Sequence, residues 1–376
     1  MLKRIGILTG GGDCPGLNPA VKWVVKTALD EELSDARGTE YEVIGIRDGW
    51  KGIVKYDPRF PVLPASTPYT EKHFARVLTE SEVRTWDRHG GTRLGSSRTN
   101  PFRPGQERWK EVVANYKSLG LSALVAIGGD DTLGIASKLS REGLNIVCIP
   151  KTIDRDLQGT DYTLGFETAV NVIVEEVDRI RTTAHSHSRA FVVETMGRYT
   201  GHLALAGGLA AGAPIILIPE VPYEPDRVIQ LLKDRRKAGH RSTILVVAEG
   251  AQEAGGKRHE REACQADGFG HPTLGGIAKR LERQLEQGTG LEVRSVELSH
   301  LQRGGVPNSY DRRIARLFGI GAVDLIQRGE YGRMVVWTEG LIQSIPIPTD
   351  LKNVRKVNVD ERYDKDNYCA KKTIFG

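Results

Sequence analysis

Reactive polar side chains occur at three places in the N-terminal half of the chain, each time directly after a short apolar run, and glycines accompany them at the first two. The first place is residues 9–18, where Gly10, Gly11 and Gly12 follow Thr9. Glycines let backbone N–H groups approach a phosphate, and the N-terminus of a following helix adds partial positive charge. The segment therefore predicts a phosphate or nucleotide site, with a purely structural glycine turn as the alternative.

This first segment does not fit the dinucleotide-binding fingerprint of dehydrogenases. Counting G-x-G-x-x-G from Gly10 places Pro15 where the last glycine belongs. The glycines therefore favour binding of a phosphate over binding of a nicotinamide cofactor.

Two carboxylates mark the second place. Asp130 and Asp131 come directly after Gly128 and Gly129. A carboxylate at the end of a buried strand, beside a phosphate loop, is placed to hold Mg²⁺ through oxygen, which phosphoryl transfer generally requires. The alternative is that one aspartate only caps a helix that begins near Thr132, and both roles can coexist because two acids are present.

The third place is residues 150–156, where Lys151 and Thr152 precede Asp154 and Asp156. These residue types offer a phosphate clamp, a hydroxyl contact to a substrate and a general base. An ordinary polar loop is the alternative interpretation. Three such loops in succession favour a shared site for phosphate chemistry.

The elements that must position these loops follow from a regular alternation of β-branched runs and amphipathic helical patterns. Strands and helices in alternation predict an α/β fold, with parallel sheets covered by helices on both faces and ligands beyond the carboxyl ends of the strands. With 376 residues the chain has the length of about two ordinary domains. Strands are expected at residues 5–9, 123–127, 145–149, 191–194, 215–218, 244–248 and 293–298, and residues 56–79 and 251–272 are expected to be surface loops.

Composition and charge narrow the classes of function. The chain has 53 Lys and Arg against 48 Asp and Glu, a net charge of +5, which is too small and diffuse to indicate a nucleic-acid partner. The longest uncharged run, residues 203–219, contains glycines and a proline and is shorter than the roughly 20 apolar residues of a membrane helix. No signal-peptide core follows Met1, and the separated Cys14, Cys148, Cys264 and Cys369 fit reduced thiols. We expect a soluble cytoplasmic protein without a membrane or nucleic-acid partner.

Seven motifs, in order, make the sequence similar to the phosphofructokinase family. They are GGGDCPGLN (10–18), GGTRLGSSR (90–98), GGDDT (128–132), PKTIDRD (150–156), MGRYTGHLAL (196–205), AEG (248–250) and HLQRGG (300–305). The resemblance implies two similar doubly wound α/β domains, with mainly parallel sheets and the active site in the cleft between them. It implies a phosphoryl-donor domain of residues 1–165 plus 302–352 and a sugar-phosphate domain of residues 166–301 plus 353–376.

The resemblance also implies roles for individual residues in a phosphotransferase that acts on fructose 6-phosphate. Asp154 matches the general base that takes the proton of the sugar 1-hydroxyl, and Asp130 matches the Mg²⁺ position. Lys151, Asp131 and Arg198 complete the implied catalytic set. Donor-binding positions are Gly12, Arg98 and Gly129, and substrate-binding positions are Thr152, Asp154, Arg189, Met196, Gly197, Arg198, Glu249, Arg294, His300 and Arg303.

Four of the substrate positions, Arg189, Arg294, His300 and Arg303, match the family's 6-phosphate cluster. Independently, three arginines and a histidine at or near strand ends predict an anion pocket, because the planar arginine fork suits phosphate oxygens. A solvated surface arginine is the alternative for each. In bacterial relatives Arg189 and Arg294 reach in from a neighbouring subunit, so the resemblance implies a homodimer or homotetramer. The nearby His185 and His187 are expected to be loop residues without a function.

The phosphoryl donor is predicted from two positions. Family members that use pyrophosphate carry Asp and Lys where this chain has Asp131 and Lys151, whereas bacterial ATP users usually have Gly at the first position. A carboxylate at Asp131 would occupy the space of the ATP α-phosphate, and two like charges 4 Å apart at an effective dielectric near 20 repel by about 4 kcal/mol. We therefore expect a pyrophosphate-dependent 6-phosphofructokinase, with an ATP-dependent enzyme or a non-catalytic sugar-phosphate-binding relative as alternatives. Arg155 departs from the usual family Asn and could lower the pKa of Asp154 or pair with Asp156.

Overall fold

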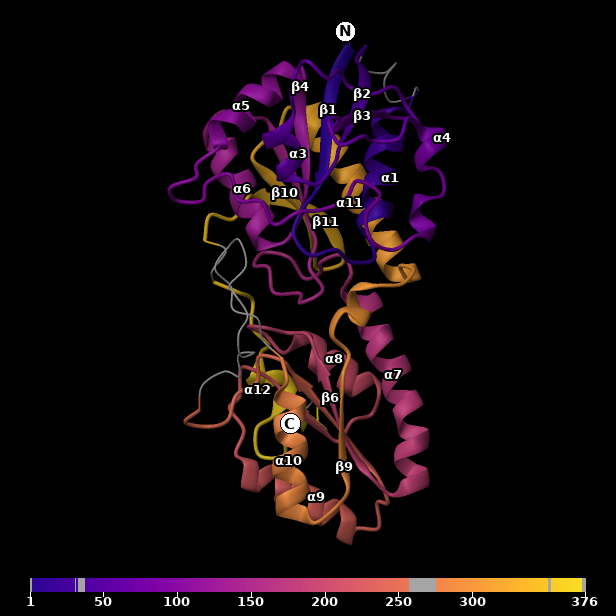
Figure 1. The fold of residues 1–376 in the computed structure, drawn as a ribbon, viewed down its shortest axis with the longest axis vertical. Helices are drawn as coiled ribbons and strands as arrows, with labels where there is room; N and C mark the ends of the chain where they lie inside the picture. Colours follow the sequence, from indigo (N-terminus) through magenta and orange to yellow (C-terminus); the bar gives the residue numbers. More distant parts are fainter. Residues whose placement is uncertain (1, 31, 33–37, 257–274, 351–352, 374–376) are drawn as a thin grey trace.

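The computed structural model describes residues 2–30, 32, 38–256, 275–350 and 353–373 in two lobes, one above the other in Figure 1. Each lobe is built on its own sheet. Apolar β-branched runs form the strands, and the glycine-rich or charged segments after them form the loops between the lobes. No described helix is both long and apolar enough to cross a membrane.

The larger sheet has seven strands in the order β11-β10-β5-β4-β1-β2-β3. The strands β1, β2, β4, β5 and β10 run parallel, and β3 and β11 pair antiparallel at the two edges. The strand bounds are β1 Leu2–Thr9, β2 Glu40–Ile46, β3 Ala75–Leu78, β4 Leu121–Gly128, β5 Ile146–Pro150, β10 Arg333–Thr338 and β11 Leu341–Pro346. The helical segments of this part are α1 Leu17–Ala28, α3 Trp50–Lys55, α4 Glu80–Val83, η1 Trp86–Arg88, α5 Trp109–Ser118, α6 Asp130–Arg141 and α11 Ser309–Arg328.

Both faces of the larger sheet are covered. Successive side chains of a strand point to opposite faces, so Ile5 and Ile7 of β1 join one apolar core, while Leu8 joins a second. The first core includes residues of α1 and α11, and the second includes Leu133 of α6. This two-sided burial explains why the strands read as continuous apolar runs rather than as alternating ones.

The smaller sheet has four parallel strands in the order β7-β8-β6-β9. Its strands are β6 Ala190–Thr195, β7 Ile215–Leu217, β8 Thr243–Ala248 and β9 Val293–Glu297. Its helical segments are α7 Phe166–His187, α8 His202–Ala210, α9 Pro225–Lys237, α10 Ile277–Thr289 and η2 Ser299–Arg303. The C-terminal segment adds α12 Val359–Arg362 and a short hairpin of β12 Tyr363–Asp364 and β13 Cys369–Ala370.

The predicted α/β fold is confirmed, and some local expectations are wrong. Residues 75–78 form edge strand β3 within a stretch expected to be loop, because their side chains are buried against β2. Helix α6 begins at Asp130 rather than near Thr132, so both aspartates lie in its first turn. His185 and His187 belong to the last turn of α7 rather than to a loop. Cys264 and most of the loop expected at 251–272 lie outside the described residues.

One buried carboxylate joins the helices that connect the lobes. Asp311, in the first turn of α11, is fully buried and accepts hydrogen bonds from Tyr162 Oη at 2.8 Å and Gly165 N at 2.7 Å. It also accepts from Thr168, through N at 2.9 Å and Oγ1 at 2.5 Å. Gly165 and Thr168 begin α7, so the negative charge lies at two helix N-termini at once, where the helix dipoles favour it.

Replacement of this carboxylate is expected to loosen the joint between the lobes. Asp311→Ala leaves four buried donor groups without their acceptor, which costs about 3–5 kcal/mol of the free energy of unfolding. Urea denaturation followed by circular dichroism measures the loss. Asp324→Ala, on the same helix but in an exposed ion pair with Arg328, is the matched control and should cost less than about 1 kcal/mol. Equal losses in the two variants would contradict this role for Asp311.

Candidate active site

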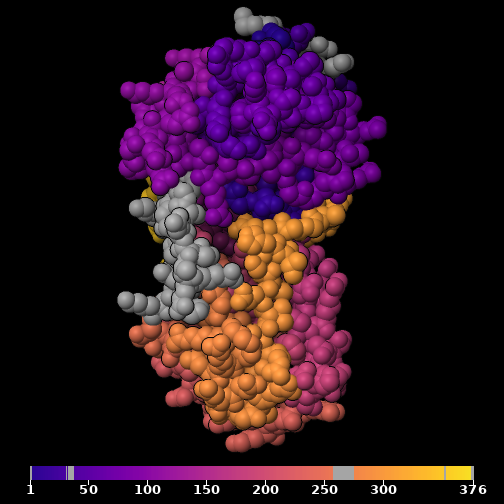
Figure 2. All heavy atoms as spheres, viewed as in Figure 1, coloured from indigo at the N-terminus to yellow at the C-terminus, as the bar shows by residue number. Residues whose placement is uncertain are grey.

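A pocket of about 320 Å³ lies between the two lobes, where the molecule narrows in Figure 2. Its walls are the loops that follow β1, β4 and β5 of the larger sheet and β6, β8 and β9 of the smaller one. The carboxyl ends of both sheets therefore face the same space. The sequence-predicted residues that line it are Gly12, Arg98, Gly129, Asp130, Asp131, Lys151, Thr152, Asp154, Met196, Arg198, Glu249, His300 and Arg303.

The wall next to Gly12 depends on close backbone packing. Asn18 of α1 donates through Nδ2 to the carbonyls of His89 and Gly90, both at 3.0 Å, and fixes the loop that carries Arg98. A Cβ on Gly90 would lie 1.9 Å from the carbonyl oxygen of Gly305, so a side chain cannot be accommodated there. The loop at 90–98 is thus pressed against the loop at 300–305, which belongs to the opposite wall.

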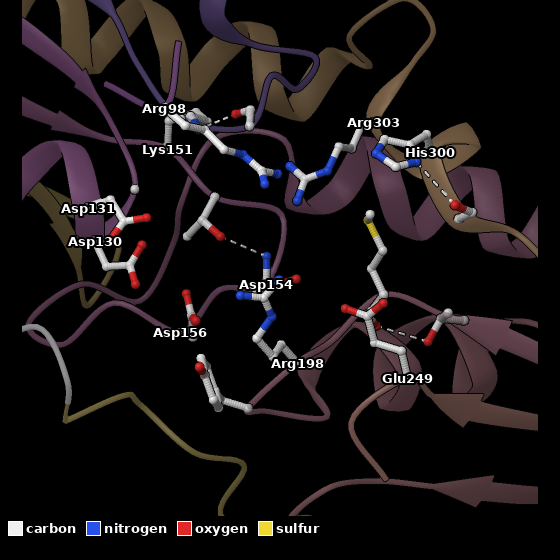
Figure 3. A pocket seen from close by; sticks show the side chains of 18 of the residues that line it. Arg98, Asp130, Asp131, Lys151, Asp154, Asp156, Arg198, Glu249, His300 and Arg303 are labelled. Atoms are coloured by element: carbon white, nitrogen blue, oxygen red, sulfur yellow. Dashed lines mark hydrogen bonds between the residues drawn. The ribbon is translucent and has the colours of Figure 1, made fainter. Parts of the chain in front are cut away.

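The acids at the start of α6 face a buried lysine. Asp130 and Asp131 lie in the first turn of that helix, and Figure 3 shows both carboxylates turned into the pocket. Lys151 is 3% exposed, and its Nζ donates to the carbonyl of Gly12. Burial lowers the pKa of Lys151, and the neighbouring Asp130 opposes that shift. The first glycine loop, the acids of α6 and the lysine after β5 therefore form one charged surface, able to hold phosphate oxygens.

The loop after β5 carries two half-buried acids, Asp154 and Asp156. Thr152 accepts from the Asp154 amide at 3.1 Å through its Oγ1, which shapes the turn. Burial raises the pKa of Asp154, and Arg303 and Arg198 partly offset that rise. Burial and the neighbouring Asp154 raise the pKa of Asp156 well above its usual value. Asp154 Oδ1 is buried and has no hydrogen-bond partner within the described part of the chain, so it is available to accept a proton from a bound hydroxyl.

The opposite wall combines one acid with cations. Glu249 follows β8, and burial, with a smaller contribution from Asp154, raises its pKa to about 7. Arg303 donates through Nη1 to the carbonyl of Asp13 at 3.2 Å, so it reaches across to the first glycine loop. Figure 3 shows Arg98, Arg198 and Arg303 directed into the pocket from different segments. Cations from both lobes can therefore act on the same anionic group.

Two predicted members of the 6-phosphate cluster lie elsewhere in the chain. Arg189 and Arg294 stand at the amino ends of β6 and β9, whereas the pocket is at the carboxyl ends. Both pair with Glu292, through Arg189 Nε at 2.6 Å and Arg294 Nη2 at 2.5 Å. Arg189 and Arg294 therefore do not join His300 and Arg303 in the pocket of their own chain, and their implied role in the pocket of a neighbouring subunit stays a prediction. Gly197 is also not part of the lining, although it sits in the MGR loop, where its carbonyl accepts from Gly250 N at 3.1 Å.

The lining also includes polar residues that the sequence analysis did not select as site residues, namely Thr132, Asp156, Glu194, Thr195, Tyr199, Glu297 and Ser299. Glu194 and Glu297 lie at or near the carboxyl ends of β6 and β9, so the position of a polar residue at a strand end is the signal that would have found them. Arg155 points away from the acids beside it. Its Nε donates to the carbonyl of Asp161 at 2.7 Å and its guanidinium lies 5.1 Å from the centre of the Phe166 ring. The expected pairing with Asp156 is therefore replaced by contacts outside the pocket.

The arrangement of acids bears on metal binding. Within the described residues, no group of three or more histidine, cysteine or acidic side chains is arranged to hold a metal ion by itself. Asp130 and its neighbours can supply one or two oxygens. This fits a divalent ion that takes most of its ligands from water and from substrate phosphates.

Comparisons with known proteins agree with this geometry. A family model described as phosphofructokinase matches residues 4–326. The chain is 44% identical over 372 residues to the pyrophosphate–fructose 6-phosphate 1-phosphotransferase of Dictyoglomus thermophilum, across 99% of this chain and 98% of that protein. It is 42% identical over 362 residues to the ATP-dependent 6-phosphofructokinase 3 of Streptomyces coelicolor, across 96% and 98% of the two chains. It matches the structure of phosphofructokinase from Saccharomyces cerevisiae with a TM-score of 0.74 and 31% identity, over 93% of this chain and 45% of that chain.

The raised pKa of Glu249 predicts a pH-dependent cost to stability. Between its ordinary pKa of 4.5 and its folded value of about 7, the folded chain binds more protons than the unfolded chain, so stability falls as the pH rises through this window. Glu249→Gln removes that cost and should raise the free energy of unfolding at pH 8 by about 3 kcal/mol, with little change at pH 4. Urea denaturation without substrate at the two pH values tests this. The exposed Glu142→Gln is the control, and an equal gain at both pH values would contradict the assignment.

Proposed function

The chain belongs to the phosphofructokinase family, and we propose that it transfers a phosphoryl group from pyrophosphate to the 1-hydroxyl of fructose 6-phosphate. The products are fructose 1,6-bisphosphate and phosphate, and the reaction is reversible, serving glycolysis or gluconeogenesis. The observation that carries the choice of donor is the second acid of α6, Asp131, facing the pocket beside Asp130 and opposite the buried Lys151. The curated relatives of Dictyoglomus thermophilum and Amycolatopsis methanolica bear the name of this activity.

The proposed mechanism assigns proton transfer to Asp154. Its unpartnered Oδ1 accepts the proton of the sugar 1-hydroxyl. As this proton leaves, the sugar 1-oxygen forms a bond to the terminal phosphorus of pyrophosphate, and the bond from that phosphorus to the bridging oxygen breaks to release phosphate. Arg198 and Arg98 stabilise the charge that spreads over the transferred phosphoryl oxygens. Lys151 supplies charge from the opposite side, where the leaving phosphate gains negative charge. The protein's part is chiefly positioning and electrostatic stabilisation, as phosphoryl transfer requires.

The divalent metal that phosphotransferases generally use is proposed to be Mg²⁺. Asp130 would hold it together with oxygens of the donor phosphates, and Asp131 lies beside that position. When bound, the ion neutralises part of the donor's charge. Few protein ligands are needed, because Mg²⁺ keeps several waters and takes phosphate oxygens.

Asp131 selects the donor by repulsion as well as by space. The first turn of a helix attracts anions, and a carboxylate already placed there competes with a phosphate for the same backbone N–H groups. Pyrophosphate has no adenosine to bind, so its affinity must come from charges such as Lys151. An ATP-dependent enzyme is the second candidate, because relatives with that name are nearly as similar to this chain.

The proposal extends to the larger organisation of the protein. Residues 1–165 plus 302–352 would form the phosphoryl-donor domain, and residues 166–301 plus 353–376 the sugar-phosphate domain. Arg189 and Arg294 lie far from the pocket of their own chain, which supports a homodimer or homotetramer in which they serve a neighbour's 6-phosphate site. We place the protein in the cytoplasm.

Loss of the base tests the mechanism. Asp154→Ala should lower kcat by at least about 10³-fold while leaving the affinity for fructose 6-phosphate within a few-fold, because general-base catalysis and its positioning are lost together. In the wild type, burial raises the pKa of Asp154, so kcat should fall with decreasing pH at higher pH values than for an ordinary aspartate. Steady-state kinetics and calorimetric binding of fructose 6-phosphate provide the measurements. A near-normal kcat in the variant would remove Asp154 from this role.

The donor assignment is tested by replacing Asp131 and Lys151 with glycine, singly and together. Asp131→Gly should give measurable ATP turnover and weaken the use of pyrophosphate, because it removes the repelling carboxylate. Lys151→Gly should depress the pyrophosphate reaction without admitting ATP, because the carboxylate stays in place. The comparison is kcat/KM for both donors in the wild type, the two single variants and the double variant, at saturating Mg²⁺ and fructose 6-phosphate.

The two effects should not add, since both side chains face the same donor phosphates. A wild-type preference for ATP would favour the second candidate. An Asp131→Gly variant that folds normally and gains no activity with ATP would contradict the role of Asp131 in excluding ATP.

A further inference from the structure

The C-terminal segment returns from the larger sheet and passes beside the loop that carries Asp154. At Arg355 it contacts three separate parts of the molecule. Its N–H donates to the carbonyl of Asp156 at 2.7 Å, its carbonyl accepts from His202 Nε2 at 2.9 Å, and its Nη2 pairs with Asp161 Oδ1 at 3.2 Å. Arg355 therefore contacts the loop that carries Asp154 and Asp156. It also contacts Asp161, which follows that loop, and the first residue of α8.

The loop needs such support because of its backbone conformation. Arg155 has φ of 54°, the left-handed region that residues with a side chain rarely adopt. It lies between Asp154 and Asp156, so the direction of both carboxylates depends on this turn. Strained residues of this kind persist only where the surrounding contacts enforce them.

Asp161 connects Arg155 and Arg355 to the larger sheet. Its carbonyl accepts from Arg155 Nε at 2.7 Å and its carboxylate accepts from Arg355. Asp161 is itself tied to the β10–β11 hairpin, since its N donates to the carbonyl of Trp337 at 2.7 Å and its Oδ2 accepts from Glu339 N at 3.1 Å. The turn at Arg155 is thus held from both sides, by its own guanidinium and by the amide of Arg355.

His202 extends the connection to the smaller lobe. It follows the loop that carries Arg198, and it is 7% exposed. Two residues after Arg355, the N–H of Val357 donates to Glu220 Oε1 at 3.0 Å, and the same carboxylate accepts from Gly201 N. A further link between the two loops is the hydroxyl of Thr200, which donates to the carbonyl of Asp154 at 3.4 Å.

We propose that Arg355 is a positioning residue: it holds the left-handed turn at Arg155 and, through His202, keeps the loop of Asp154 in register with the loop of Arg198. Arg355 does not line the pocket, so it acts through the residues it orients. The inference rests on the proposed function only in its kinetic consequence. The contacts themselves can be tested without catalysis.

The first test is amide hydrogen exchange of the unliganded full chain. In Arg355→Ala the amides of residues 154–156 should exchange at least about tenfold faster than in the wild type, because the ion pair that anchors the segment is lost. Lys356→Ala, which changes the exposed neighbour, is the matched control and should leave exchange unchanged. Exchange at wild-type rates in a folded Arg355→Ala variant would overturn the proposal.

The second test separates positioning from binding. Arg355→Ala should lower kcat about tenfold or more, with the KM values for fructose 6-phosphate and the donor within about threefold of wild type. Arg355→Lys should restore part of kcat. Asp161→Asn, which keeps the side-chain acceptor for Glu339 but removes the charge, should lower kcat in a way that does not add to Arg355→Ala.

The kinetic outcomes distinguish this inference from the assignment of the function. If the wild type uses ATP in place of pyrophosphate, the donor assignment fails, but the ratio of each variant to wild type still tests the positioning. If the wild type is active and Arg355→Ala has a normal kcat, or loses activity no more than Lys356→Ala, the positioning role is wrong. Additive losses in the Arg355 and Asp161 variants would likewise overturn it.

Discussion

Half-buried carboxylates that lie next to one another in a single pocket impose the main physical constraint on this protein. Asp154 and Asp156 lie in one short loop, and burial raises the pKa of each. Such groups stay ionised only where cations approach them, and here Arg303 and Arg198 come from the opposite wall. The two lobes must therefore meet with their strand ends facing each other. A pocket on the larger lobe alone would leave Asp154 with Lys151 but without Arg198.

The rest of the chain holds the lobes in that position with contacts that tolerate little movement. Asp311 binds the first turns of two helices with one charge. Gly90 and Gly305 approach so closely that no side chain fits between them. Because the Gly90–Gly305 contact joins the segments that carry Arg98 and Arg303, the geometry of the pocket depends on this backbone contact.

The sequence predicts what is local and misses what depends on distant segments. The glycine loops and the acids after β4 and β5 were found because each follows a recognisable buried strand. The direction of the strands also explains the position of Arg189 and Arg294. Arg189 directly precedes β6 and Arg294 is the second residue of β9, so both lie at the amino ends of their strands. The orientation of Arg155 was not predictable, because it is set by Asp161 and Phe166, and the contacts of Arg355 join residues about 200 positions apart.

The charges of the pocket show that the substrates proposed for it need more positive charge than its lining supplies. Its lining includes seven aspartate or glutamate side chains and four arginine or lysine side chains, so the empty site is not a ready receptor for two anionic substrates. Three changes reduce this excess. Acids with raised pKa, such as Asp156 and Glu249, can carry a proton. In the proposed enzyme a divalent ion would bind at Asp130, and further arginines would come from a neighbouring subunit. A donor with no nucleoside depends on the balance of acidic and basic groups in the pocket more than ATP does, because it can bind only through its charged phosphates. The combination of Asp131 and Lys151 fits such a donor. Asp131 excludes the bulkier ATP, and Lys151 supplies the positive charge that pyrophosphate requires.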